Sequence, residues 1–115
     1  MIGNGFNDAR RKSITTQCVP FYSTILALGN PRIDFMSLDI EGAELLVLKT
    51  IPFDLVDISV LLIEIDHLGE IFEGDNDELR RFLHKQDYVF YKRLSIDDVY
   101  VKKSFLKKLK KLWFE

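Results

Sequence analysis

The chain has 115 residues, which is enough for one small domain with a single hydrophobic core. Hydrophobic residues make up 47% of it, and the net charge is −2, so bulk charge predicts neither a nucleic-acid nor a membrane partner. Its one cysteine, Cys18, excludes an internal disulfide and a zinc cluster built from cysteines. We expect Cys18 to be a small, buried apolar side chain.

Residues 1–13 are polar and rich in glycine and asparagine, which predicts an N-terminal loop. They contain no apolar run, so they are not a signal peptide, and no segment of the chain reaches the roughly 18 apolar residues of a membrane span. For this chain by itself, these features predict a cytoplasmic location. Gly3-Asn4-Gly5 is only superficially similar to a phosphate-binding loop, because such a loop follows a strand and opens a helix.

Strand and helix patterns alternate through residues 14–103, which we predict to form one domain. The predicted elements are a strand over 14–19, a helix over 23–28, strands over 33–40 and 58–65 separated by a helix over 43–51, a helix from Asp75, and strands over 88–92 and 99–103. This order predicts an α/β fold with right-handed crossovers and a parallel sheet, closed by an antiparallel hairpin.

Three local patterns support these elements. The runs 33–40 and 58–65 are mostly apolar, which is typical of strands covered on both faces. Asp75 is placed to cap a helix, and Glu78 three residues later completes a capping box. The Gly29-Asn30-Pro31 sequence predicts the end of the helix over 23–28.

Residues 104–115 form a basic, amphipathic tail. Its lysines lie opposite an apolar stripe made by Phe105, Leu106, Leu109, Leu112 and Trp113. We expect this segment to dock its stripe on the sheet or to fray. The alternative is a weak contact between the tail and an anionic membrane surface.

Acidic residues follow both apolar strands. The first strand ends in Asp39-Ile40-Glu41-Gly42 and the second in Glu64-Ile65-Asp66-His67. Side chains two apart on a strand point the same way, and open α/β sheets bind ligands at the carboxyl ends of their strands. If the strands are neighbours, four carboxylates surround one crevice, and their repulsion raises pKa values. Such a group suits the acceptance of a proton from a hydroxyl or amine, or the binding of a divalent cation.

Simpler interpretations of the same residues stay open. Asp39 or Glu41 caps the following helix, and Gly42 supplies only a tight turn. We expect Glu44 in the first turn of that helix, where the macrodipole favours an acid. His67 is either a polar loop residue or a catalytic one, and His84 is predicted to be solvated. We assign no metal ligand from the sequence.

The run from Ile33 to Leu48 resembles the central motif of FkbM-type methyltransferases. That motif is an apolar strand, then Asp-x-Glu-Gly-x-Glu (here Asp39 to Glu44), then a leucine-rich helix. The later strand, helix and aromatic segment extend the resemblance to about residues 14–103. The sequences at 18–21 and 49–53 are similar to the invertebrate branch that includes the Star protein.

The resemblance implies the carboxyl-terminal portion of a Rossmann-like, class I methyltransferase fold that uses S-adenosylmethionine. Family members transfer methyl groups, often to hydroxyl oxygens of small molecules or sugars. By this resemblance Asp39 and Glu41 are the catalytic residues, and either orients the acceptor or acts as base. From their places at and after the strand ends, we expect Gly42, Glu44, Glu64, Asp66 and His67 to lie near the substrate or cofactor. The sequence lacks a strand with the family's glycine-rich cofactor turn, so we do not expect this chain alone to bind S-adenosylmethionine.

The Star-like resemblance implies a second possibility. This is a non-catalytic protein that acts in the export of epidermal-growth-factor-receptor ligands from the endoplasmic reticulum to the Golgi. Its partner is then a membrane-bound growth-factor ligand, and its location is those membranes. With either function, we expect the strand at 33–39 to form a sheet edge that invites aggregation.

Overall fold

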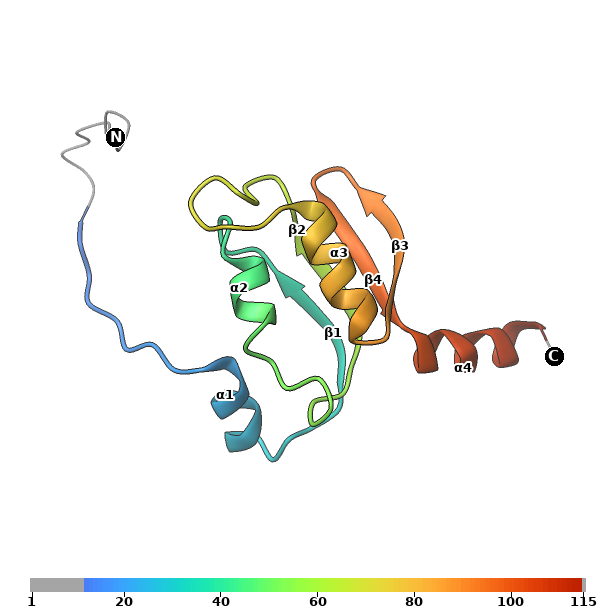
Figure 1. Ribbon diagram of the computed structural model, residues 1–115. Helices are drawn as coiled ribbons and strands as arrows, with labels where there is room; N and C mark the ends of the chain where they lie inside the picture. Colours follow the sequence, from blue (N-terminus) through green and yellow to red (C-terminus); the bar gives the residue numbers. More distant parts are fainter. Residues whose placement is uncertain (1–11, 115) are drawn as a thin grey trace.

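The structure, a computed structural model, describes residues 12–114. It contains four helices and four strands in the order shown in Figure 1. The helices are α1 (Phe21–Ala27), α2 (Glu44–Leu48), α3 (Asn76–Lys85) and α4 (Lys103–Phe114), and the strands are β1 (Ile33–Leu38), β2 (Ile58–Glu64), β3 (Tyr88–Leu94) and β4 (Asp97–Lys102).

The strands form one mixed sheet in the order β1-β2-β4-β3. β1 and β2 are parallel, and β4 lies antiparallel to both β2 and β3. The predicted α/β class and its closing antiparallel hairpin are therefore confirmed. In the β1–β2 register, Leu38 lies opposite Ile63, so both strands end at the same edge of the sheet.

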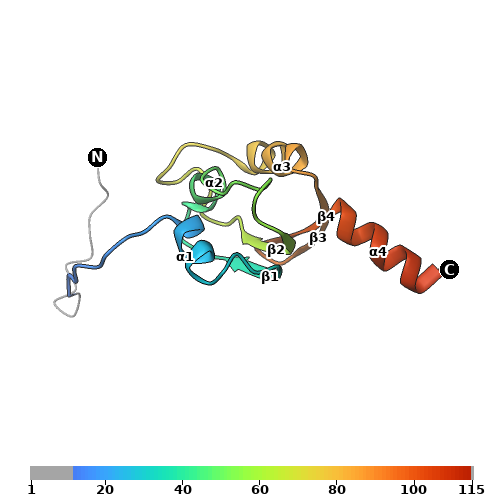
Figure 2. The same ribbon diagram turned by 90° about the horizontal axis from the view of Figure 1, so that it is seen from below.

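Helices α1, α2 and α3 lie on one face of the sheet, and no helix in the described part of the chain covers the opposite face (Figure 2). The core lies between these helices and the sheet. Leu79 and Leu83, four residues apart on α3, are fully buried, as the apolar periodicity predicts. They pack in one cluster with Leu48 of α2 and Leu61 of β2.

A buried carboxylate connects α3 to the hairpin. Asp98 of β4 is 0% exposed, and its Oδ1 accepts a hydrogen bond of 2.7 Å from Nε of Arg93. Its Oδ2 accepts bonds from Arg93 (3.2 Å) and from Arg80 of α3 (3.4 Å). Two guanidinium groups therefore satisfy a charge that is otherwise costly to bury.

The predicted strand at 14–19 is wrong. Residues 12–20 form neither helix nor strand, and Ile14 is 81% exposed. A β-branched segment gains stability only from a paired neighbour, and the described residues offer it none. Cys18 is exposed on this segment, so its predicted burial is also wrong. The rest of the predicted N-terminal loop, including Gly3-Asn4-Gly5, lies outside the described residues.

β1 is an edge strand among the described residues, as predicted, but it is not covered on both faces. Phe35, on the face away from the helices, is 56% exposed. The strand ends at Leu38, two residues before the predicted end, and α2 is shorter than the predicted 43–51. An apolar run that looks doubly buried in sequence is therefore buried here on one face only.

The helix start at α3 follows half of the predicted capping box. Asp75 caps the helix, because its Oδ1 accepts a 2.7 Å bond from the backbone N–H of Glu78. The Glu78 carboxylate instead accepts a 2.7 Å bond from Nζ of Lys49, which links α3 to the end of α2.

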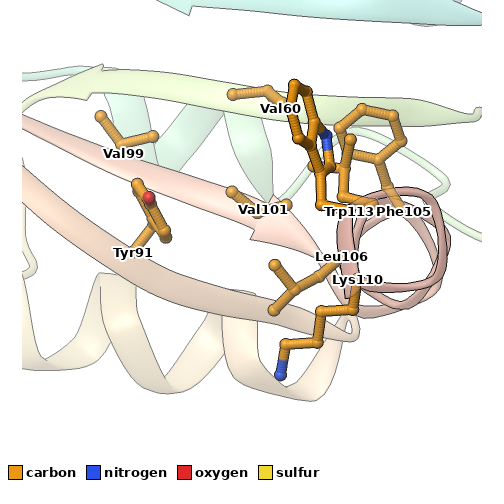
Figure 3. A pocket seen from close by; sticks show the side chains of 9 residues that line it. Val60, Tyr91, Val99, Val101, Phe105, Leu106, Lys110 and Trp113 are labelled. Atoms are coloured by element: carbon orange, nitrogen blue, oxygen red, sulfur yellow. The ribbon is translucent and has the colours of Figure 1, made fainter. Parts of the chain in front are cut away.

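The tail forms α4 and extends away from the sheet (Figures 1 and 2). Its first turns and the sheet face opposite the other helices border an apolar groove of about 500 Å³, which Phe105, Leu106 and Val101 help to line (Figure 3). Further along, Leu112 and Trp113 are 78% and 79% exposed. Leu109 and Trp113 line the same groove, so the helix does not fray and its apolar stripe borders the groove, while its end stays largely exposed. Within the described residues, no helix has the length and apolar character of a membrane span.

The Asp98 network predicts a stability effect. Replacing Asp98 with Asn removes charge-assisted hydrogen bonds inside the core, and we expect unfolding free energy to fall by about 2 kcal/mol. Urea denaturation measures this change. The control is Asp97→Asn at the adjacent, half-buried aspartate, where we expect a change below about 0.5 kcal/mol. Equal losses in the two variants would show that the network does not stabilise the hairpin.

Candidate functional site

The acidic residues after β1 and β2 lie together at one edge of the sheet. One carboxylate oxygen from each of Asp39, Glu41 and Glu64 lies within 4.8 Å of the others. A second group, within the same distance, joins Glu64 to Asp66 and His67. We call these five residues the acidic edge. Parallel pairing of the two strands produces this convergence, since both carboxyl ends reach the same side.

The turn after β1, and not strand alternation, brings Glu41 to this edge. Both Asp39 and Glu41 lie beyond the end of β1, and Glu41 has a φ of +57°, a left-handed conformation that is uncommon for residues other than glycine. Gly42 follows with a φ of +104°. The chain therefore reverses tightly enough to direct the Glu41 side chain back towards Glu64.

Glu44 holds this turn closed. Its side chain is buried, and its Oε1 accepts hydrogen bonds from the backbone N–H of Ile40 (2.8 Å) and of Gly42 (3.3 Å). It also begins α2, as predicted, where an acid is favoured by the helix macrodipole. Ala43 occupies the N-cap position, and no side chain caps the helix there. The capping interpretation of Asp39 and Glu41 is therefore wrong, which leaves both carboxylates at the edge.

Gly42 also allows the two turns to touch. A Cβ atom added to it would lie 2.7 Å from the backbone oxygen of His67, closer than real Cβ contacts. The absence of a side chain thus lets the turn after β1 pack directly on the turn after β2. The simple tight-turn interpretation of Gly42 is confirmed, and the same turn positions the acidic edge.

His67 lies among carboxylates. Its Nε2 is 3.2 Å from Oε2 of Glu41 and 3.9 Å from Oδ2 of Asp66, and its Nδ1 is 3.0 Å from Oε2 of Glu70. The hydrogen bond to Glu70, followed by the charges of Glu70, Glu41 and Glu64, raises the pKa of His67 despite some desolvation. The other histidine, His84, is exposed on α3, as predicted.

Glu64 is the buried member of the acidic edge. It is 5% exposed at the end of β2, and its Oε2 has no hydrogen-bond partner. A hydrogen bond with Asp39, then desolvation and the charges of Asp39 and Glu41, raise its pKa from 4.5 to about 7. A carboxyl group with this pKa exchanges its proton near neutral pH, as general acids and bases do.

One residue of this region, and the structural role of another, were not predicted from the sequence. Glu70 was not considered, although it is the partner of Nδ1 of His67. Its spacing of three residues from a histidine in a turn was the available signal. The role of Glu44 in closing the turn was also missed, because it requires the side chain to fold back towards the strand.

The close contact at Gly42 predicts a loss of stability in Gly42→Ala. Both Gly42 and Gly29 have positive φ, but a Cβ at Gly29 would meet nothing within 4 Å. We expect Gly29→Ala to cost about 1 kcal/mol from backbone strain alone and Gly42→Ala to cost clearly more. Chemical denaturation of both variants measures the difference. Equal costs would contradict direct packing of the two turns.

The raised pKa of Glu64 predicts a measurable titration. The ¹³C carboxyl shift of Glu64 should change with a midpoint of about 7, and Asp39→Asn should lower this midpoint by removing the main cause of the shift. Since the pKa is raised in the folded state, protonated Glu64 stabilises the fold at low pH. That contribution is lost as the pH rises from 4.5 to about 7. A midpoint near 4.5 in the unmodified chain would contradict the coupling.

Comparison with known proteins identifies the family of the chain. The sequence profile of the methyltransferase FkbM domain matches residues 3–90, which is more than half of the chain. This match includes the acidic edge and ends within β3, so it starts earlier and ends earlier than the predicted range of 14–103. No curated protein and no solved structure matches the chain. The chain belongs to the FkbM methyltransferase domain family.

Proposed function

We propose that this domain takes part in methyl transfer to a hydroxyl oxygen, and that the acidic edge receives the acceptor. The observation that carries the proposal is the convergence of Asp39, Glu41 and Glu64 at the carboxyl ends of two parallel strands. This is where open α/β sheets bind their ligands. Membership of a methyltransferase family supplies the reaction class.

The geometry gives each residue a part in accepting a hydroxyl. The Oε2 atom of Glu64 has no protein partner, so it is free to accept a hydrogen bond from the acceptor. With its pKa at about 7, Glu64 then takes the hydroxyl proton at neutral pH, and a lone pair on the oxygen becomes available for methylation. Asp39 shares a hydrogen bond with Glu64, and His67 holds Glu41 in place through a 3.2 Å contact.

The family suggests S-adenosylmethionine as the methyl donor, but the described residues do not provide a complete binding site for it. Its carboxylate requires N–H donors, such as those of a glycine-rich turn between a strand and a helix. The turn from β1 into α2 instead uses the N–H groups of Ile40 and Gly42 to bind Glu44, and the edge beside it presents carboxylates. The residues of 12–114 therefore form an acceptor side without a donor cradle, and we assign them no step on the donor.

A second candidate is the Star-like function, a non-catalytic role in the export of growth-factor-receptor ligands. One observation favours it, namely that α4 extends into solvent with Leu112 and Trp113 exposed beside lysines. Such a surface suits a protein partner or the headgroups of a membrane. The Star-like role would not use the acidic edge. The two functions therefore predict that substitutions at different residues, in the acidic edge or on α4, abolish activity.

Calorimetric titration of S-adenosylmethionine into this chain, and into the complete reading frame that contains it, tests the methyltransferase function. We expect the protein encoded by that reading frame to bind S-adenosylmethionine and to methylate hydroxyl-bearing sugars or small molecules. We expect the chain alone not to bind S-adenosylmethionine. Absence of binding in both forms would contradict the proposal and favour the Star-like function.

Two variants of the form that transfers methyl groups can then be compared, one at Glu64 and one at a control position. Glu64→Gln keeps the shape of the side chain and removes its ability to take a proton, so we expect methyl transfer to fall about 100-fold with donor affinity unchanged. Glu73→Gln is the matched control, because Glu73 is exposed in the loop before α3. Equal rates in the two variants would exclude Glu64 as the proton acceptor.

A further inference from the structure

The acidic edge combines donor atoms at spacings close to those around a metal ion. Oxygens of Asp39, Glu41 and Glu64 all lie within 4.8 Å of one another. Two oxygens on opposite sides of a bound Mg²⁺ are about 4 Å apart, because each lies about 2.1 Å from the ion. Small side-chain rotations are therefore sufficient to bring three carboxylates onto one cation.

The burial of Glu64 supplies an independent reason to place a cation there. Its side chain is 95% buried, as its relative exposure is 5%, and its Oε2 accepts no hydrogen bond. The Glu64 carboxylate also contributes one oxygen to the group formed with Asp39 and Glu41. Buried polar atoms almost always have a partner, and a buried charge is usually paired or bound to a metal. Among the described residues, no N–H or O–H group donates a hydrogen bond to Oε2.

The surroundings resemble the outer shell of a metal site. Carboxylates that bind metals are usually held by further hydrogen bonds, and here Nε2 of His67 is 3.2 Å from Oε2 of Glu41. The other ring nitrogen of His67 is fixed by Glu70 at 3.0 Å. Lysine and arginine form no ion pair with Asp39, Glu41 or Glu64 in the part of the chain that the structure describes. Beyond the His67 contact with Glu41, a divalent cation would supply the positive charge that these carboxylates lack.

We propose that Asp39, Glu41 and Glu64 bind one hard divalent cation, Mg²⁺ or Mn²⁺, with His67 and Glu70 orienting Glu41. Three carboxylates and water are the ligands these ions prefer, while softer metals favour thiolates. The cation would take the unpartnered Oε2 of Glu64 as a ligand and keep open positions for water or for a substrate oxygen.

The site also has a use in the proposed reaction. A cation at this edge would bind an acceptor hydroxyl directly and make its proton easier to remove, and Glu64 would then serve as a ligand of the cation in place of the proton acceptor. Cation binding is nevertheless measured without donor or acceptor. Failure of the cation proposal and failure of methyl transfer are therefore separate results, obtained with different ligands.

Manganese titration of the purified chain at one fixed pH tests the proposal. We expect saturable, one-to-one binding of Mn²⁺ by electron paramagnetic resonance, and competition by Mg²⁺. Paramagnetic broadening of amide NMR signals should be strongest at Gly42, which borders the acidic edge, and at Asp66, which belongs to it. Broadening centred on the acidic loop at Glu73 or on another surface would overturn the assignment.

Matched variants separate a built site from general attraction to acidic residues. We expect Glu64→Gln and Asp39→Asn each to weaken Mn²⁺ binding by at least about tenfold, since loss of even an outer-shell partner costs that much. Glu73→Gln removes the same charge from an exposed position and should leave affinity within about twofold. Equal weakening in all three variants, or no saturable binding, would overturn the proposal. Unchanged NMR spectra in the absence of metal show that each variant is folded.

Discussion

The parallel pairing of β1 with β2 is the constraint on which the rest of the site depends. Its register sets Leu38 opposite Ile63, so Asp39 and Glu64 leave the sheet side by side. A shift of one residue would turn every side chain of β1 to the other face and separate these carboxylates. The register is fixed by apolar burial, because Leu61 and Ile63 are fully buried beneath the helices. Core packing far from the chemistry therefore determines which acids meet at the edge.

Closing the turn after β1 requires two unusual features, and both help to position the carboxylates of the acidic edge. Gly42 must lack a side chain, since its backbone packs on the carbonyl of His67. Glu44 must turn its buried carboxylate back to the N–H groups of Ile40 and Gly42. Because Glu44 satisfies these donors, Asp39 and Glu41 are not needed as caps. The Asp-x-Glu-Gly-x-Glu motif thus divides into a part that builds the turn and a part that remains available to a ligand.

Elements that depend on apolar pattern and local turn chemistry could be predicted from the sequence. Elements and contacts that depend on a partner elsewhere in the chain could not. The runs at β1 and β2, the Asp75 cap and the hairpin could all be predicted, since each follows from residues adjacent in the chain. The segment at 14–19 has the composition of a strand but has no described neighbour with which to pair. The convergence of the acids was predicted from strand alternation, whereas the left-handed turn at Glu41 produces it. The Glu70 contact with His67 depends on how a loop folds, which the sequence pattern does not encode.

The apolar groove beneath α4 and the acidic edge differ in what they can do. The apolar groove beneath α4 is large, at about 500 Å³, but the polar groups of its lining are few, namely those of Lys110, Tyr91 and Trp113, so it suits binding more than reaction. The acidic edge instead gathers carboxylates around the buried Glu64. A buried carboxylate with an unpartnered oxygen lowers stability relative to a well-packed apolar side chain. Strain of this kind is typical of functional sites, where activity is retained at the expense of stability. The Glu64 carboxylate is therefore best explained by a ligand that completes its coordination, whether that ligand is an acceptor hydroxyl or a cation.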